Sequence, residues 1–277
     1  MPTASKALLC ALAAILIWAS LATLGTLVRA VPPFLLVGLS LGIAGLLCTP
    51  FWREWRVPPR TVLVGVAGIF GYHFLLFSAF RSAPAVQANT LNYLWPLVIV
   101  LGTPLVFPKL RLGPRHLAGA LLGFAGAALV VSQGRLSLSA QYATGYVLAV
   151  LAALTWGGYS LLTKRLPPFP TRAVGLFCLL SGLSSLACHF LLEPRYQLTI
   201  EQGWVIAGLG LGPMGGAFFL WDWAMKHGDP RSIGALAFAT PLLSTALLVM
   251  TGQGQLSLWS LAALACILSG ALLAGRN

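Results

Sequence analysis

The side chains best suited to binding a small molecule lie together in the stretch Asn89-Thr-Leu-Asn-Tyr-Leu-Trp-Pro96. The two asparagine amides both donate and accept hydrogen bonds, and the tyrosine and tryptophan rings offer surfaces for stacking. Pro96 has no backbone N–H, so within a helix it leaves one carbonyl without its usual partner. These groups suit a ligand that combines a flat ring with a zwitterionic head.

A continuous helix over this stretch would gather its polar groups on one face. At about 100° per residue, the two asparagines, Tyr93 and Pro96 would share an arc of roughly 100°, with Trp95 beside it. The neighbouring residues are apolar enough to cross a bilayer, where a freed carbonyl is tolerated only against protein or a water-filled cavity. We interpret this face as the wall of a substrate cavity. The structural alternative is that the amides bond neighbouring helices together.

Five further side chains interrupt apolar segments and are candidates for the same cavity. Trp18 and Trp156 lie deep in their segments, although membrane tryptophans usually gather at the interfaces, and Tyr159 follows one turn later. Tyr72 and His73 interrupt a third segment, and an intramembrane histidine is by default a functional candidate. The structural alternatives are tryptophans that fill space beside glycine and a neutral imidazole bonded to a carbonyl.

Two sets of residues are therefore predicted to serve function. The substrate-binding set is Trp18, Tyr72, His73, Asn89, Asn92, Tyr93, Trp95, Pro96, Trp156 and Tyr159. The second set is expected to allow close helix packing or a hinge, because glycine every fourth residue lets helices approach and proline bends them. It consists of Gly208, Gly212, Pro213, Gly216 and Pro241.

The acidic residues are too few to suggest catalysis. Of the five Asp and Glu residues, only Asp222 is expected within a membrane segment, where Lys226 one turn later can pair with it. The sequence contains no HExxH, GxSxG or nucleotide-binding motif, and its five cysteines lack metal-binding spacing. We expect no catalytic residue, no metal site and no cofactor.

The elements that position these residues are expected to be membrane helices. The chain is 58% hydrophobic and only 8% charged, which leaves too little polar surface to cover a soluble globule. We predict an all-α polytopic membrane protein with ten transmembrane helices and no soluble domain. The spans are expected at residues 7–28, 33–50, 61–80, 84–106, 113–132, 142–163, 171–192, 203–224, 230–250 and 257–275.

The basic residues predict the orientation of these spans. Of the 17 Lys and Arg residues, thirteen fall in loops on one side and four on the other. Because cytoplasmic loops are enriched in Lys and Arg, both termini are expected in the cytoplasm. The net charge of +12 is attributed to topology, and no nucleic-acid partner is expected. The aromatic residues at 218, 219, 221 and 223 are expected towards the cytoplasmic end of their span, with Trp223 in the interface.

The two halves of the chain resemble one another. Matching residues recur after 138 to 145 positions, namely Trp18 and Trp156, Arg81 and Lys226, and Pro96 and Pro241. Five spans per half is an odd number, so the second half would cross the membrane in the opposite sense. We predict two inverted five-helix repeats, at residues 1–136 and 137–277, within one membrane unit. Such repeats commonly enclose a site near the middle of the bilayer and switch access to it.

Ten spans in two halves, with a tryptophan in the first span and a proline in the fourth span of each, resemble the EamA type of the drug/metabolite transporter superfamily. The likeness covers essentially the whole chain. The stretch Ala88-Asn-Thr-Leu-Asn-Tyr-Leu-Trp-Pro96 is similar to the fourth-helix signature of the aromatic amino acid exporters in this superfamily. The second half has Ala237-Phe-Ala-Thr-Pro241 at the matching place and so lacks the amides. The resemblance implies outward transport.

We therefore expect a transporter in the cell membrane, taken to be a bacterial inner membrane. It would export small amphipathic metabolites, foremost aromatic amino acids, by alternating access. The expected partners are a small-molecule substrate and the lipid bilayer, and the oligomeric state is left open, with a monomer compatible. The alternatives are an exporter of cationic or aromatic drugs and a non-transporting membrane scaffold. Facilitated flow is the simplest mechanism without a coupling carboxylate, and proton exchange through His73 is the second.

Overall fold

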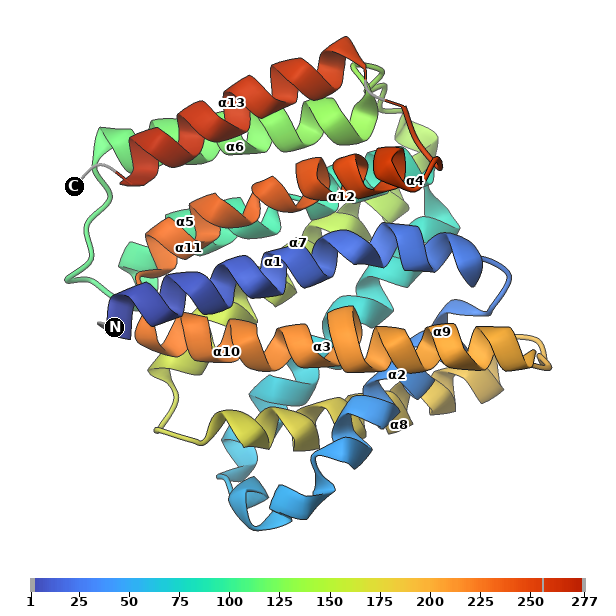
Figure 1. Ribbon diagram of the computed structural model, residues 1–277. Coiled ribbons are helices and arrows are strands. Elements are labelled where there is room, and N and C mark those ends of the chain that lie inside the picture. The colour runs from blue at the N-terminus through green and yellow to red at the C-terminus, as the bar shows by residue number, and fades with distance from the viewer. Residues whose placement is uncertain (1–2, 256, 276–277) are drawn as a thin grey trace.

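A computed structural model describes residues 3–255 and 257–275, and every regular element in these ranges is a helix (Figure 1). The elements of the first half are α1 (Thr3–Leu27), α2 (Pro33–Leu47), η1 (Thr49–Trp55), α3 (Pro59–Ser82), α4 (Ala85–Asn92), α5 (Trp95–Val106) and α6 (Pro114–Ser132). Those that follow are η2 (Ala140–Tyr142), α7 (Ala143–Arg165), η3 (Thr171–Ala173), α8 (Val174–Leu192), α9 (Ile200–Leu211), η4 (Gly212–Gly216), α10 (Ala217–His227), α11 (Pro230–Ala237), α12 (Ala239–Met250) and α13 (Leu258–Gly275).

All ten predicted segments coincide with helical stretches, but not all qualify as long apolar spans. Within the described residues, eight stretches are long and apolar enough to cross a membrane. A ninth results if α2 and η1, which are bent by 81° at Cys48, count as one broken span, and α13 is a shorter apolar helix. The outer surface is apolar, with Leu105 85% and Phe190 80% exposed. This surface is that of a multi-pass membrane protein.

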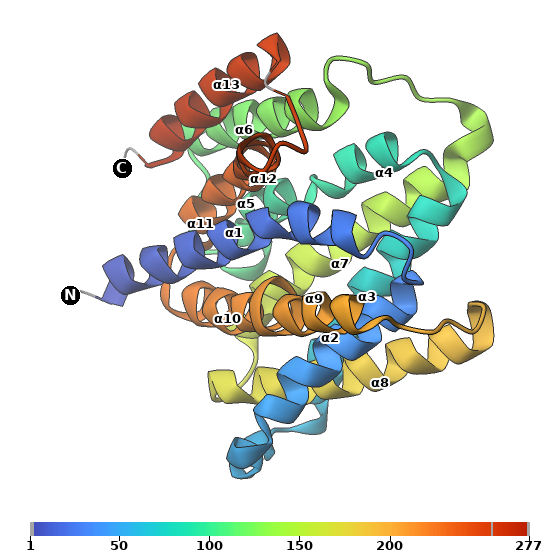
Figure 2. The same ribbon diagram turned by 45° about the vertical axis from the view of Figure 1, so that its right-hand side comes forward.

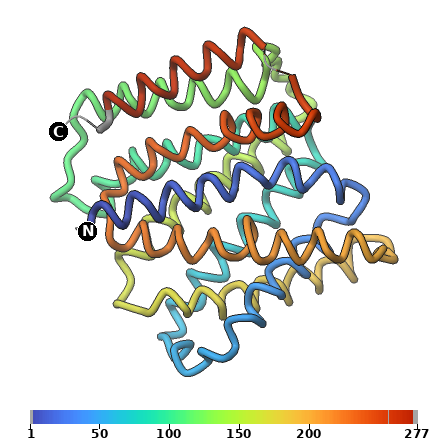
Figure 3. Tube along the Cα trace, viewed as in Figure 1, coloured from blue at the N-terminus to red at the C-terminus, as the bar shows by residue number. Residues whose placement is uncertain are grey.

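The helices pack mainly in pairs that join the two halves of the chain. The most extensive contacts are between α2 and α8, α3 and α7, α1 and α10, and α6 and α13. Figures 1 and 2 show α1 running away from the end of the molecule where both termini lie, whereas α7 runs back towards that end. The chain trace in Figure 3 follows the same course. Helices from both halves therefore surround the middle of the molecule.

The fourth predicted span contains a turn, although residues 85–106 together still form one apolar stretch of spanning length. Helix α4 ends at Asn92 and α5 begins at Trp95, with Tyr93 and Leu94 in a turn between them. Pro96 lies in the first turn of α5, where a missing N–H costs least. The turn makes the helix locally irregular, so the regular spacing assumed for the polar arc does not hold strictly across residues 93–94. The ninth predicted span is interrupted in the same way at Phe238, between α11 and α12.

The eighth predicted span is also irregular, because Gly212–Gly216 forms a π-helical segment between α9 and α10. Such a segment inserts one residue into the helix and leaves backbone groups that need partners from elsewhere. Gly215 is required here, since a Cβ at this position would lie 1.8 Å from the carbonyl oxygen of Gly210. The predicted bend near Pro213 is thus a π-helical insertion.

We predict that Gly215→Ala destabilises the protein while Gly158→Ala does not. The added methyl at Gly215 collides with the Gly210 carbonyl, whereas a Cβ at Gly158 meets nothing within 4 Å. Overpacking of this kind costs about 1–3 kcal/mol. Thermal unfolding in detergent, followed by the loss of monodisperse protein, should show a lower midpoint for Gly215→Ala only. Equal midpoints for the two variants would contradict the described π-helical segment.

Candidate functional site

Four tryptophans and a phenylalanine from four different helices meet in the middle of the molecule. We call them the aromatic cluster, which consists of Trp18 on α1, Trp95 on α5, Trp156 on α7, and Phe218 and Trp221 on α10. Trp18 is its centre, with ring centroids 5.1 Å from Trp221, 5.8 Å from Trp156 and 6.1 Å from Trp95. Most of these rings meet edge to face or tilted, the arrangement that aromatic quadrupoles favour.

Three more residues of the predicted set border the cluster. The ring of Tyr72 lies 5.3 Å from that of Trp156, and Tyr159 lies 5.5 Å from it on the other side. His73 is buried, with its ring 6.2 Å from that of Phe218. The structure therefore brings together α3 and α7, which supply the polar ring atoms, with the tryptophans of α1 and α5.

The polar groups beside the cluster fill only part of their hydrogen-bonding capacity. The side-chain N–H of Asn92 donates to the hydroxyl of Tyr72 at 3.3 Å, while its carbonyl oxygen has no hydrogen-bond partner within the described residues. Asn92 is only 4% exposed, so this free acceptor is buried, and a buried acceptor without a partner is costly. A ligand N–H group could satisfy it.

His73 is fixed by its own helix. Its Nδ1 lies 2.7 Å from the carbonyl oxygen of Ile69. Because a carbonyl only accepts hydrogen bonds, Nδ1 must carry the proton, which leaves Nε2 as an acceptor in the neutral ring. This is the arrangement that the structural alternative for His73 anticipated. It does not prevent Nε2 from bonding a ligand.

Trp18 connects the cluster to the π-helical segment. Its indole Nε1–H donates to the carbonyl oxygen of Pro213 at 3.0 Å. Trp221 uses its indole in a similar way and donates to the hydroxyl of Ser160 on α7 at 3.0 Å. The ring of Trp18 therefore serves two contacts at once, one with the other rings and one with the backbone of the irregular segment.

Several predicted residues lie away from the cluster. Asn89 is only half-buried, one turn before Asn92. Tyr93 packs instead against a second apolar cluster that contains Val100 and Phe238. In the second set, Pro213 and Pro241 are buried, but a Cβ on Gly208 would meet nothing within 4 Å and one on Gly212 only Ile17 at 3.6 Å. The close contacts in this region are made by Gly210, Gly215 and Gly216, so the predicted packing stripe is only partly correct.

Phe218 and Trp221 were not among the predicted binding residues. We expected the aromatic residues of this span to gather at its cytoplasmic end, yet Trp221 is only 1% exposed and contacts both Trp18 and Trp95. Their spacing of three residues, which places both on one helical face, was the available signal. Trp223 points elsewhere and stacks on His227 at 4.3 Å.

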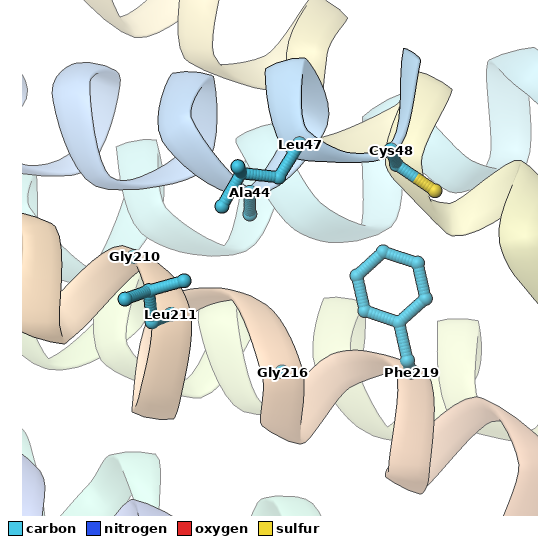
Figure 4. Close-up of a pocket in the computed structure, with 7 residues that line it drawn as sticks. All are labelled: Ala44, Leu47, Cys48, Gly210, Leu211, Gly216 and Phe219. Carbon is cyan, nitrogen blue, oxygen red and sulfur yellow. The ribbon is translucent and has the colours of Figure 1, made fainter. Parts of the chain in front are cut away.

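Two grooves are formed outside the aromatic cluster. One, of about 210 Å³, lies between the end of α2 and the π-helical segment, where Phe219 faces Cys48 (Figure 4). The other, of about 290 Å³, is apolar and lies between α5 and α7 beside Leu97 and Leu154. Neither is lined by a predicted binding residue, because the rings of the aromatic cluster pack against each other.

The predicted pair of Asp222 and Lys226 is present. Their Oδ2 and Nζ atoms are 2.6 Å apart, and the Asp222 side chain is buried. The hydroxyl of Thr171 donates to the same oxygen at 2.7 Å. The carboxylate is thus neutralised by a cation on its own helix. Within the described residues, no three side chains of His, Cys, Asp or Glu come together closely enough to hold a metal ion.

Comparison with known proteins agrees with this architecture. The pattern of the EamA-like transporter family matches the chain twice, at residues 5–132 and 143–276. The chain is 40% identical to an aromatic amino acid exporter YddG from Ancylobacter novellus, over 98% of this chain and 97% of that protein. It is also 26% identical to the exporter of the same name from Salmonella typhimurium, over 96% of each chain.

A solved crystal structure has the same fold. It superimposes with a TM-score of 0.93 and 39% sequence identity, over 98% of this chain and 96% of that one. The resemblance that we identified in the sequence is thereby confirmed, and the family is one of transporters. The chain belongs to the EamA-like transporter family.

Proposed function

We propose that this protein exports aromatic amino acids from the cytoplasm across the inner membrane by alternating access. The observation that carries the proposal is the packing of four tryptophans beside Tyr72, which bonds Asn92, whose amide oxygen has no partner within the described residues. Relatives that cover nearly the whole chain and are named aromatic amino acid exporters support the substrate class.

The chemistry of the aromatic cluster suits an aromatic zwitterion. An indole or phenyl ring can replace one of the present ring contacts, each of which contributes about 0.5–1.5 kcal/mol beyond area burial. The ammonium group can donate to the amide oxygen of Asn92, and the ring nitrogen Nε2 of His73 offers a second acceptor. Entry of such a substrate requires the rings to separate, so the packed cluster corresponds to a closed state.

The proposed mechanism rests on two inverted halves with ten spans, residues 1–136 and 137–277, and on cytoplasmic termini. The family pattern matches each half separately. If α1 exchanges with α7 and α3 with the α9–α10 unit, the contact of α1 with α10 becomes the contact of α3 with α7. The same exchange relates the contact of α2 with α9 to that of α8 with α3. This pairing, with the opposite directions of α1 and α7, supports an inverted repeat.

Asn92→Ala should abolish most tryptophan transport while leaving the protein folded. It removes the amide oxygen proposed to bind the substrate ammonium, and a hydrogen bond to a charged group contributes about 1.5–3 kcal/mol. We expect efflux of labelled tryptophan from proteoliposomes to fall at least about tenfold at low substrate concentration. Asn89→Ala, at the half-buried position one turn earlier, serves as the control. Equal loss in both variants would remove Asn92 from the site.

Trp95→Ala should weaken binding of aromatic substrates more than Trp95→Phe does. Its ring packs on Trp18 and Trp221, and loss of one aromatic contact corresponds to about two- to tenfold in half-saturation concentration. The measurement is the concentration dependence of tryptophan efflux, repeated with a quaternary ammonium dye. A wild-type protein that moves the dye but not tryptophan would favour a cationic-drug exporter instead.

Transport should depend little on an imposed pH gradient. Asp222 is the carboxylate on the cluster-bearing helix α10, and Lys226 and Thr171 already bond its Oδ2, although its Oδ1 has no partner within the described residues. We expect initial tryptophan efflux from proteoliposomes to change less than about twofold when a gradient of about one pH unit is applied in either direction, because no free carboxylate is available as a relay. A larger change that disappears in His73→Gln would instead support proton exchange through His73.

A further inference from the structure

The carboxylate of Glu193 fastens one end of α8 to two other helices. Glu193 directly follows α8, and its side chain is only 1% exposed. It accepts the backbone N–H groups of Phe34 at 3.0 Å and Leu35 at 3.2 Å, at the start of α2, where the helix dipole favours an anion. Its other contacts are Nδ1 of His189, on its own helix at 2.9 Å, and the guanidinium of Arg81 at 2.7 Å.

Arg81 connects this group to α3. It lies in the last turn of α3, and its guanidinium also sits 5.2 Å from the ring centroid of Phe34. Its side chain is 43% exposed, so the bond lies at the edge of the molecule, where water can replace it. We call the group of Glu193, Arg81 and the start of α2 the first lock.

A second charged group fastens the opposite end of α8. Thr171, three residues before α8, donates its hydroxyl to Oδ2 of Asp222 on α10 at 2.7 Å. Lys226, also on α10, donates to the backbone carbonyl of Phe169 at 3.1 Å, and its Nζ lies 3.3 Å from the centroid of that ring. We call this group the second lock.

The two locks occupy matching places in the two halves. Arg81 and Lys226 are 145 residues apart, the same spacing as Pro96 and Pro241. Each lies near the end of the helix that precedes a span with a central turn, α4–α5 in one case and α11–α12 in the other. Figures 1 and 2 show the start of α8 at the end of the molecule with both termini and the end of α8 on the opposite side. The locks are therefore on opposite faces.

The locked helices also carry the aromatic cluster and its border. Helix α3 supplies Tyr72 and His73, and α10 supplies Phe218 and Trp221. A movement of the end of α3 away from Glu193, or of the end of α10 away from Thr171, would thus open a path from one face to the same central rings. Alternating access requires such paths to open one at a time.

We propose that Arg81 and Thr171 are positioning residues that close the two faces in turn, each through its contact with one end of α8. This inference rests on the proposed alternating access, not on the identity of the substrate. Both sets of contacts are formed in this structure. Release of the Arg81 contact opens the face away from the termini, and release of the Thr171 contact opens the face that bears them.

Two substitutions can break the locks without leaving a buried charge alone. Arg81→Met leaves Glu193 bonded to Phe34, Leu35 and His189. Thr171→Val is nearly isosteric and leaves the pair of Asp222 and Lys226 intact. Folding should therefore survive in both variants, and Arg81→Lys and Thr171→Ser should restore wild-type behaviour because they keep the charge and the hydroxyl.

The test is hydrogen exchange of the full-length protein in lipid vesicles, compared between α4 and α11, the helices that follow the locked ones. Arg81→Met should raise exchange in α4 at least about twofold and leave α11 unchanged. Thr171→Val should raise exchange in α11 and leave α4 unchanged, and the double variant should raise both. Matched controls are Arg195→Met, at an exposed arginine near Glu193, and Thr49→Val, whose hydroxyl bonds within its own segment.

A parallel efflux measurement separates this inference from the proposed function. Each single variant should lower the maximal tryptophan flux at least about threefold and change the half-saturation concentration less than about twofold. Increased exchange at both ends in both single variants, or at neither end, would overturn the two locks even if tryptophan is exported. If each single variant raises exchange only in its own helix, α4 or α11, but the wild-type protein shows no tryptophan flux, the two locks are supported and the substrate proposal is wrong.

Discussion

Inside a bilayer, a backbone carbonyl that a helix irregularity releases needs a partner within the protein or in a water-filled cavity, because the lipid offers none. The bond from the Trp18 indole to the Pro213 carbonyl meets this requirement for the π-helical segment. The same ring is the centre of the aromatic cluster. The irregular backbone of the eighth predicted span and the side chains proposed to bind substrate are therefore held by one residue. The aromatic cluster and the π-helical segment are therefore in direct contact through Trp18.

Charged side chains lie towards the ends of the bundle, whereas the polar side chains at its middle are uncharged. Asp222 and Glu193 have buried side chains, and each pairs with a basic residue: Arg81 links Glu193 to α3, and Lys226 links α10 to the loop carbonyl of Phe169. Between them, the aromatic cluster and its border offer ring faces, the amide of Asn92, the imidazole of His73 and the hydroxyls of Tyr72 and Tyr159. Such a site can recognise a zwitterion without a fixed counter-charge, since ring quadrupoles and single hydrogen bonds are weak individually. Loose selectivity within one chemical class would follow.

The helical segments and most central residues could be predicted, because both depend on local information. Apolar runs separated by charged loops located all ten helical stretches. Trp18 and Trp156 stood out since tryptophan deep in a span is unusual, and both join the cluster. The face of Asn89 and Tyr93 was predicted for a regular helix, whereas the chain makes a turn at Tyr93 and Leu94. A proline indicates that a helix is irregular nearby but does not give the position. The position also depends on which neighbouring helices offer partners to the released backbone groups.

The sequence by itself determined that this is a helical membrane protein, that similar residues recur in its two halves and that its few polar intrusions are candidates for binding. These properties follow from composition, spacing and the hydrophobic length of a bilayer. Only the tertiary structure decided that Trp221 faces the centre while Trp223 does not, and that Glu193, a residue at a span edge, is buried against the start of α2. These contacts either join residues more than a hundred positions apart or depend on which face of one helix points to the centre. Local periodicity carries no information about which neighbour each face will meet.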